Sequence, residues 1–186
     1  MSASIEVKQA LLASGAVISV LEDVVQLVVS AFRSRRKVLF CGNGGSAADA
    51  QHLAAELSGR FYLDRPPLFA EALHVNGSFL TAVANDYGYD EVFARAVRAM
   101  GQQGDVLFAL STSGHSANIL KAIKAAKGLG MKVVGLTGAS GGDMADQCDL
   151  LIQIPSTDTP RIQEGHLLIG HIICELTESV LFNSSN

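Results

Sequence analysis

Five short apolar runs alternate with stretches of helical periodicity, and this alternation constrains the fold more than any other feature. Each run has the length of a buried strand, and several end directly at a glycine or a serine. Apolar strands that alternate with helices form parallel sheets covered on both faces. The chain is therefore predicted to be an α/β three-layer sandwich with a five-stranded parallel sheet flanked by helices. The predicted strands are residues 37–42, 68–75, 105–111, 132–138 and 149–155.

The remaining sequence is predicted to be mostly helical. Apolar spacing over residues 4–31 predicts one or two helices, and Pro160 is placed to start a last helix over about 161–182. A length of 186 residues, with no linker or low-complexity tract, indicates one domain spanning 1–186. The other predicted helices occupy about 46–61, 78–84, 90–101 and 116–130.

The chain is more apolar than a soluble monomer of this size needs to be. Hydrophobic residues make up 48% of it and charged residues 17%. The most apolar stretch, 165–182, carries His166, His171, Glu175 and Glu178, which would be costly in a bilayer. We therefore expect no membrane partner, and expect the first and last helices to be buried in interfaces between subunits.

Charge and cysteine content exclude two further classes. The formal net charge is −4 and no basic run stands out, so a nucleic-acid partner is not expected. Cys41, Cys148 and Cys174 are odd in number and far apart, which fits neither a disulfide framework nor a CxxC metal pair. Together with an N-terminus that lacks a signal-peptide layout, they indicate a reduced, cytoplasmic compartment.

The first candidate site is the glycine-rich loop over residues 41–50. It lies between a predicted strand and a predicted helix, where backbone N–H groups favour an anion, and Asn43 and Ser46 add side-chain donors. The loop also fits the dinucleotide pattern G-x-G-x-x-A, which is weak evidence alone. The alternative is a tight turn without a ligand. The three residues of the pattern are Gly42, Gly44 and Ala47.

The second candidate site is a hydroxyl-rich loop over residues 111–118. A helix start needs only one cap, so the remaining hydroxyls favour a phosphate monoester with several acceptor oxygens. The loop lacks the lysine of a nucleotide-hydrolysing P-loop, and a dinucleotide enzyme would not need it, so no nucleotide cofactor is expected. The four hydroxyls belong to Ser111, Thr112, Ser113 and Ser116.

Two pairs of polar residues are spaced for acid–base or metal chemistry. His52 and Glu56 stand at i and i+4 and share a helix face. Gln163 and His171 are eight residues apart, or roughly 80° around a helix, so they can address one site. The alternatives are a helix-surface pair and a histidine satisfied in the core. His166, about 140° from His171, is interpreted as a core histidine.

The motifs in their order resemble the phosphoheptose isomerases of the sugar isomerase (SIS) fold from end to end. They are CGNGGSAADAQH, NDYGYDEVF, STSGHSAN, LTG and RIQEGH. The resemblance implies a flavodoxin-like SIS fold and a cytoplasmic homotetramer. It also implies aldose–ketose isomerisation of a phosphorylated seven-carbon sugar, sedoheptulose 7-phosphate, to D-glycero-D-manno-heptose 7-phosphate. That reaction is the first step toward nucleotide-activated heptose for lipopolysaccharide or another surface polysaccharide.

The resemblance also implies roles for individual residues. The hydroxyl-rich loop would hold the substrate phosphate, and the glycine-rich loop would contact sugar and phosphate. A zinc ion, one per subunit, would be bound by His52, Glu56, Gln163 and His171, with Glu56 and His171 also transferring protons. The substrate-binding set it implies is Asn43, Gly44, Gly45, Ser46, Glu56, Asn85, Asp86, Ser111, Thr112, Ser113, Ser116 and Gln163.

One departure and two alternatives accompany the resemblance. Some family members carry an acidic residue just before the R-I-Q-E segment, where this chain has Thr159 and Pro160, so a sugar contact there is in doubt. The fold also serves other sugar phosphates. It occurs in non-catalytic binding modules too, including a replication-initiator-associating protein. The presence of both Glu56 and His171 favours an enzyme.

Overall fold

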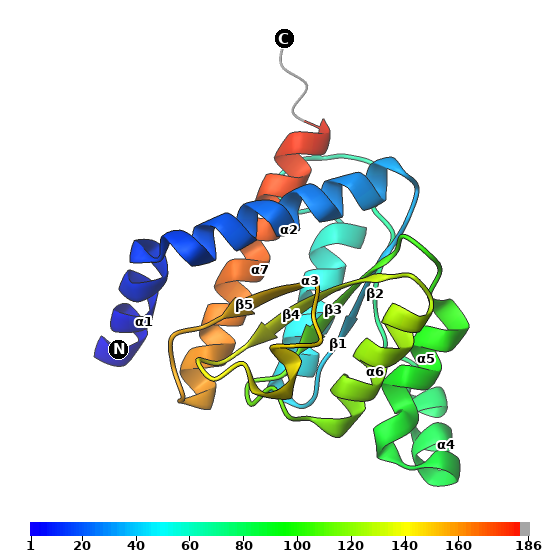
Figure 1. The fold of residues 1–186 in the computed structure, drawn as a ribbon. Coiled ribbons are helices and arrows are strands. Elements are labelled where there is room, and N and C mark those ends of the chain that lie inside the picture. The colour runs from blue at the N-terminus through cyan, green and yellow to red at the C-terminus, as the bar shows by residue number, and fades with distance from the viewer. Residues whose placement is uncertain (183–186) are drawn as a thin grey trace.

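The computed structural model describes residues 1–182, and residues 183–186 of the predicted domain lie outside the described part. It confirms a parallel five-stranded sheet, with strand order β2-β1-β3-β4-β5 (Figure 1). All five strands fall within the predicted runs. Their bounds are β1 Val38–Cys41, β2 Ala70–Ala72, β3 Val106–Leu110, β4 Lys132–Thr137 and β5 Leu150–Gln153.

Strand β2 is shorter than the predicted run over 68–75. It lies at the edge of the sheet and pairs only with β1, in the register Val38 with Ala70. Pro66 and Pro67 precede it and have no N–H group to donate to a ladder. Beyond it the chain turns at once, and the Val75 N–H donates to the Ala72 carbonyl. Past the strand Leu73 is still buried, whereas Val75 is exposed, so the apolar run is longer than the strand.

Seven α-helices and two short 3-10 segments make up the other described elements. The predicted helical stretch over 4–31 is two helices, because Ser14 ends the first and caps the second by accepting from the Val17 N–H. The helices are α1 Ser2–Ala13, α2 Gly15–Arg33, α3 Gly45–Ser58, α4 Gly77–Tyr87, α5 Val92–Met100, α6 Ala117–Gly128 and α7 Thr159–Phe182, and the 3-10 segments are Tyr89–Glu91 and Gly142–Met144.

The sheet lies between two helical layers, as predicted (Figure 1). Phe40 and Phe108 stack on one face, with ring centroids 4.9 Å apart, in a core shared with α2, α3 and α7. Leu39 and Leu107 point to the opposite face, into a core shared with α4, α5 and α6. Adjacent residues of one strand thus enter different cores, so these strands are apolar throughout.

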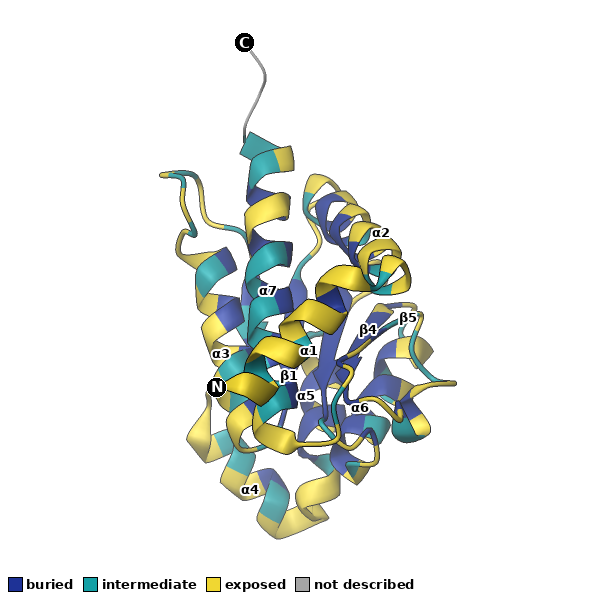
Figure 2. Ribbon diagram, turned by 90° about the vertical axis from the view of Figure 1, so that its left-hand side faces the viewer, coloured by how far each residue is buried: buried dark blue, intermediate teal, exposed yellow. Residues whose placement is uncertain are grey.

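Helices α2 and α7 are long and apolar enough to span a membrane by length and composition alone. Both pack against the same face of the sheet, where Val24, Val28 and Ile169 are buried. That test is weak evidence for a membrane, since core helices pass it as well. Helix α1 instead lies across α7 and is almost wholly exposed (Figure 2).

The chain reverses its direction of winding between β1 and β3, which are neighbours in the sheet. From β1 it passes to the edge strand β2, and from β3 to β4 on the other side. Ligands of open α/β sheets bind at such a point, outside the carboxyl ends of the strands. Both candidate loops begin there, because the first follows Cys41 and the second follows Leu110.

Candidate functional site

The first loop is a tight turn that leads directly into α3. Gly44 precedes the helix with φ at +55°, and no side chain caps the first N–H groups of α3. A Cβ at Gly42 would collide with the Ser46 carbonyl, so the turn requires glycine there. Ser46 itself is buried. The turn thus presents the amino end of α3 at the sheet edge, as an anion site would require.

The second loop is ordered largely by its own hydroxyls. The Ser111 and Ser116 Oγ atoms lie 3.0 Å apart, and the Ser111 Oγ also accepts from the Gly114 N–H at 3.2 Å. The Ser113 Oγ accepts from the His115 N–H. Ser116 stands at the cap position of α6, yet its side chain makes no capping bond. The hydroxyls therefore shape the loop while the start of α6 keeps its backbone donors.

A pair of amides joins the two loops. Asn43 from the first and Asn118 from α6 exchange two hydrogen bonds of 2.9 Å, and the Tyr89 hydroxyl donates to the Asn43 Oδ1 at 3.1 Å. Asn118 is buried. Sequence reasoning missed Asn118 and Tyr89. A usable signal for Asn118 was an amide in the first turn of a helix whose other residues on that face are apolar. The amide pair fixes the spacing of the loops.

A pocket of about 260 Å³ opens beside the second loop. His115 lines it, and its Nδ1 lies 2.8 Å from the Asp143 Oδ2. Thr112 and Ser113 supply hydroxyls to the same wall. The remaining lining residues are Gly138, Ala139, Ser140, Ser156, Thr157, Thr159 and Ile162.

Helices α3 and α7 bring three metal-ligating side chains together. The Nε2 atoms of His52 and His171 lie 2.8 Å apart, and the His52 Nε2 lies 3.3 Å from the Glu56 Oε1. One donor atom from each of the three lies within 4.8 Å of the others. Two imidazoles and a carboxylate are ordinary zinc ligands, so this donor set fits the ion that the resemblance implies. The group can hold a metal ion.

Asp49 is a further acidic group beside this cluster, one helical turn before His52. Its Oδ2 is buried and has no hydrogen-bond partner among residues 1–182. Burial raises the pKa of the Asp49 carboxyl, and nearby His52 acts in the opposite direction. Sequence reasoning did not single out this residue, because an aspartate within an alanine-rich helix resembles a solvent-facing one.

The remaining residues discussed from the sequence lie at several different places in the structure. The Gln163 side chain packs directly against Gly45, at the start of α3. Asn85 donates to the Asp86 Oδ1 at 2.8 Å, and both are exposed on α4. Asp86 is not part of the metal-ligating group found among residues 1–182. His166 is fully buried, with its Nε2 3.3 Å from the Thr137 carbonyl oxygen, so it is a core histidine as interpreted.

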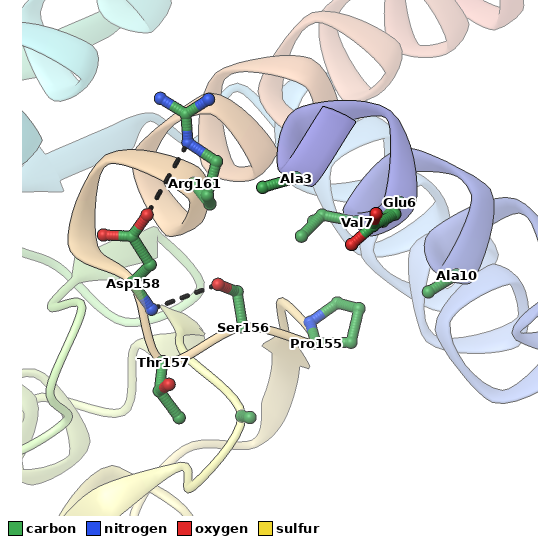
Figure 3. A pocket seen from close by; sticks show the side chains of 10 residues that line it. Ala3, Glu6, Val7, Ala10, Pro155, Ser156, Thr157, Asp158 and Arg161 are labelled. Carbon is green, nitrogen blue, oxygen red and sulfur yellow. Dashed lines mark hydrogen bonds and ion pairs between the residues drawn. The ribbon is translucent and has the colours of Figure 1, made fainter. Parts of the chain in front are cut away.

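A second pocket, of about 530 Å³, separates α1 from the connection between β5 and α7 (Figure 3). Asp158 points toward Arg161 there, with its Oδ2 3.9 Å from the Arg161 Nε. Pro160 therefore has an acidic neighbour two residues earlier, but that carboxylate faces an arginine. This pocket shares Ala139, Ser156 and Thr157 with the pocket beside the second loop.

Comparisons with known proteins agree with this geometry. A family model described as the SIS domain matches residues 8–138. A phosphoheptose isomerase of Rhodospirillum rubrum is 60% identical over 155 residues, which cover 83% of this chain and 82% of that protein. One from Aneurinibacillus thermoaerophilus is 49% identical, covering 99% and 93%. The solved phosphoheptose isomerase of Neisseria gonorrhoeae superposes with a TM-score of 0.88 at 44% identity, covering 95% and 93%.

Proposed function

The chain belongs to the phosphoheptose isomerases of the SIS domain family, and we propose that it converts D-sedoheptulose 7-phosphate to D-glycero-D-manno-heptose 7-phosphate. It is a sugar-phosphate isomerase. The observation that carries the assignment is the convergence of His52, Glu56 and His171 from two helices, beside two loops suited to a phosphate. A non-catalytic sugar-phosphate module would not need this convergence.

Substrate binding is divided between the loops and the start of α3. The hydroxyls of the second loop and the backbone N–H groups at the start of α6 bind the phosphate. Its charged oxygens accept stronger hydrogen bonds than neutral acceptors do. From Gly45 to His52, α3 rises about 10 Å, which separates the phosphate end from the reacting end of a long sugar chain. The proposed binding residues are Asn43, Gly44, Gly45, Ser46, Glu56, Asn85, Asp86, Ser111, Thr112, Ser113, Ser116 and Gln163.

Proton transfer is assigned to Glu56 and His171. Glu56 takes a proton from C1 of the ketose and, after exchange with solvent, delivers a proton to C2, so that an enediol forms and collapses to the aldose. His171 moves a proton between the oxygens on C1 and C2, because its ring adjoins the same space. No hydride or external redox reagent is needed, since the carbon that loses its proton is oxidised as its neighbour is reduced.

A metal ion fits the same side chains. His52, Glu56 and His171 would hold zinc. Gln163 is the proposed fourth ligand, although an amide oxygen is an unusual one and its side chain, which packs against Gly45, would have to turn toward the other three. When bound, zinc would polarise the sugar oxygens and favour the enediol. Glu56 would then alternate between metal ligation and proton transfer, because a carboxylate held tightly by zinc is a weak base.

The same proposal covers assembly and cellular role. We infer a cytoplasmic homotetramer with α1, α2 and α7 at its interfaces, which is supported by exposed apolar residues on these helices. The product would enter nucleotide-activated heptose synthesis for lipopolysaccharide or another surface polysaccharide.

Turnover of sedoheptulose 7-phosphate, followed by NMR, tests the proposed reaction. The zinc-supplied parent protein is compared with His171→Ala and Glu56→Gln. The expected result is turnover by the parent and a loss of 10²-fold or more in each variant. Absence of turnover by a folded parent would contradict the assignment and favour another sugar phosphate. Undiminished turnover by Glu56→Gln would remove Glu56 from the mechanism.

The route of the proton is tested separately with substrate deuterated at C1. Transfer through a carboxylate exposes the proton to solvent, so deuterium is expected to wash out during turnover. Full retention of deuterium in the product would indicate a hydride shift and overturn the enediol route.

A further inference from the structure

A buried ion pair lies next to the metal-ligating cluster and has no role in the chemistry described so far. The Arg65 Nε lies 2.9 Å from the Glu178 Oε2, and both side chains are only 2% exposed. Burying two charges is costly, and well-packed apolar residues of similar size often serve stability equally well. Stability alone therefore does not explain the pair, and its contacts with the backbone indicate a further role.

Glu178, on α7, holds the segment that follows α3. Its two carboxylate oxygens accept from the N–H groups of Phe61, Tyr62 and Leu63, at 3.1, 2.8 and 2.8 Å. Burial alone would raise the pKa of Glu178, but these donors and Arg65 outweigh it and hold the pKa below its usual range. One ionised carboxylate thus fixes three consecutive backbone groups to α7.

Arg65 holds the end of α3 itself. Its Nη2 donates to the Glu56 carbonyl at 3.0 Å, and its Nη1 donates to the carbonyls of Leu57 and Gly59 at 2.7 and 3.2 Å. The last carbonyls of a helix have no partner within the helix, so a cation placed there caps them. The guanidinium fork therefore fixes the last turn of α3, which carries Glu56.

The pair is also linked to His171. Phe61, one of the residues held by Glu178, has its ring centroid 5.7 Å from that of His171. Glu178 is seven residues after His171 on α7, which is about two turns along nearly the same face. The ion pair thus joins the backbone of Glu56, the aromatic neighbour of His171, and α7.

We propose that Arg65 and Glu178 form a brace that sets the spacing of Glu56 and His171, and so act as positioning residues for the isomerisation. The inference rests on the proposed function and adds two residues to it. Within residues 1–182, the hydrogen bonds of Arg65 and Glu178 go to one another and to residues 56–66, so the brace acts on the reacting end of the site. Its loss should reduce kcat and metal affinity without weakening substrate binding.

The test uses two conservative variants of the full-length protein. Arg65→Lys keeps the charge but cannot reach three carbonyls at once, and Glu178→Gln keeps the shape but loses the charge. We expect kcat to fall about 10-fold or more, with KM for sedoheptulose 7-phosphate within about two-fold of the parent value. We also expect Zn²⁺ affinity, measured by chelator competition, to fall about 10-fold. A fall in kcat at nearly unchanged KM, or a fall in Zn²⁺ affinity, supports the brace.

One control and one substitute variant separate positioning from loss of stability. Ile123→Ala removes a buried side chain from α6, on the opposite face of the sheet. It should lower the melting temperature and leave kcat and Zn²⁺ affinity unchanged. Phe61→Leu keeps the apolar volume, removes the ring beside His171, and replaces the brace variants if they do not fold.

The brace is overturned if Arg65→Lys and Glu178→Gln fold and keep the parent kcat and Zn²⁺ affinity. Where neither folds, a Phe61→Leu protein with parental kcat and Zn²⁺ affinity overturns it instead. If the parent does not turn over sedoheptulose 7-phosphate, the proposed function has failed. The Zn²⁺ measurements then still decide whether the brace positions the cluster.

Discussion

At the scale of single residues, the two histidines of α7 show how position on one helix decides chemistry. His171 faces α3 and meets His52, whereas His166, five residues earlier, is buried against the sheet. Burial lowers the pKa of His166 from 6.5 to about 4, although the hydrogen bond to the Thr137 carbonyl opposes the shift. His166 is therefore held neutral, and protonating it works against the fold.

We predict that His166 makes the protein sensitive to acid. Below pH 6.5 the unfolded chain takes up a proton here that the folded protein does not accept until about pH 4, so stability falls as pH drops. Between pH 7 and pH 5 the loss from this group is about 2 kcal/mol. Urea unfolding at the two values measures it. In His166→Gln, which cannot titrate, the loss should shrink by that amount, and an unchanged loss would contradict the assignment.

The amide pair between the loops carries a second prediction at this scale. Asn118→Ala leaves Asn43 without its buried partner, which should cost about 1–3 kcal/mol of stability. Because the pair joins the two loops that are proposed to bind the phosphate, KM should rise several-fold while kcat changes less. Steady-state kinetics with sedoheptulose 7-phosphate measures both constants. The control is Gln102→Ala, which removes an exposed amide shortly before β3, at the amino ends of the strands. Equal KM values in the two variants would contradict the prediction.

At the scale of elements, the sequence predicts the features that depend on local pattern, such as the strands and the residues that share one helix face. The strands appear within the apolar runs, three of which end in glycine or serine, and the pairing of His52 with Glu56 follows from helical spacing. The approach of His52 to His171 depends on how α3 packs against α7, which spacing alone leaves open. The same holds for Arg65, whose partner Glu178 is 113 residues away. The predicted run 68–75 extends beyond β2 because Leu73 remains buried after the strand ends, and apolar composition alone does not mark that end.

Gly45, the first residue of α3, offers a test in which stability and activity should move in opposite directions. Alanine favours a helix over glycine by about 0.5–1 kcal/mol, so Gly45→Ala should not destabilise α3. Its Cβ, however, would occupy the position of the Gln163 amide, which must move. We expect an equal or higher melting temperature and a kcat/KM reduced about 10-fold or more.

The matched control for this variant is Gly15→Ala, at the start of α2. A Cβ there meets nothing within 4 Å, so the same substitution has room. It should keep full activity, and its melting temperature should not fall. If Gly45→Ala also keeps full activity, Gln163 does not contribute to the site from its present position.

At the scale of the whole molecule, the apolar surplus of the sequence remains visible on the surface. Ile5 and Leu12 are exposed on α1, at a spacing of seven residues, and Leu176 and Val180 are exposed on α7, at a spacing of four. Each pair therefore shares one face of its helix. These faces belong to the layer that contains α3 and α7 (Figure 2).

Leu176→Glu tests whether this surface is an interface between subunits. The side chain is 40% exposed in the single chain, so a charge there should cost the isolated fold little. In a tetramer that buries it, the same charge would be desolvated without a partner, and the assembly should dissociate. Light scattering at micromolar concentration should give a tetramer mass for the parent and a smaller mass for the variant. Gln102→Glu, an exposed position at the amino edge of the sheet, should keep the parental mass, whereas a monomeric parent would overturn the proposed assembly.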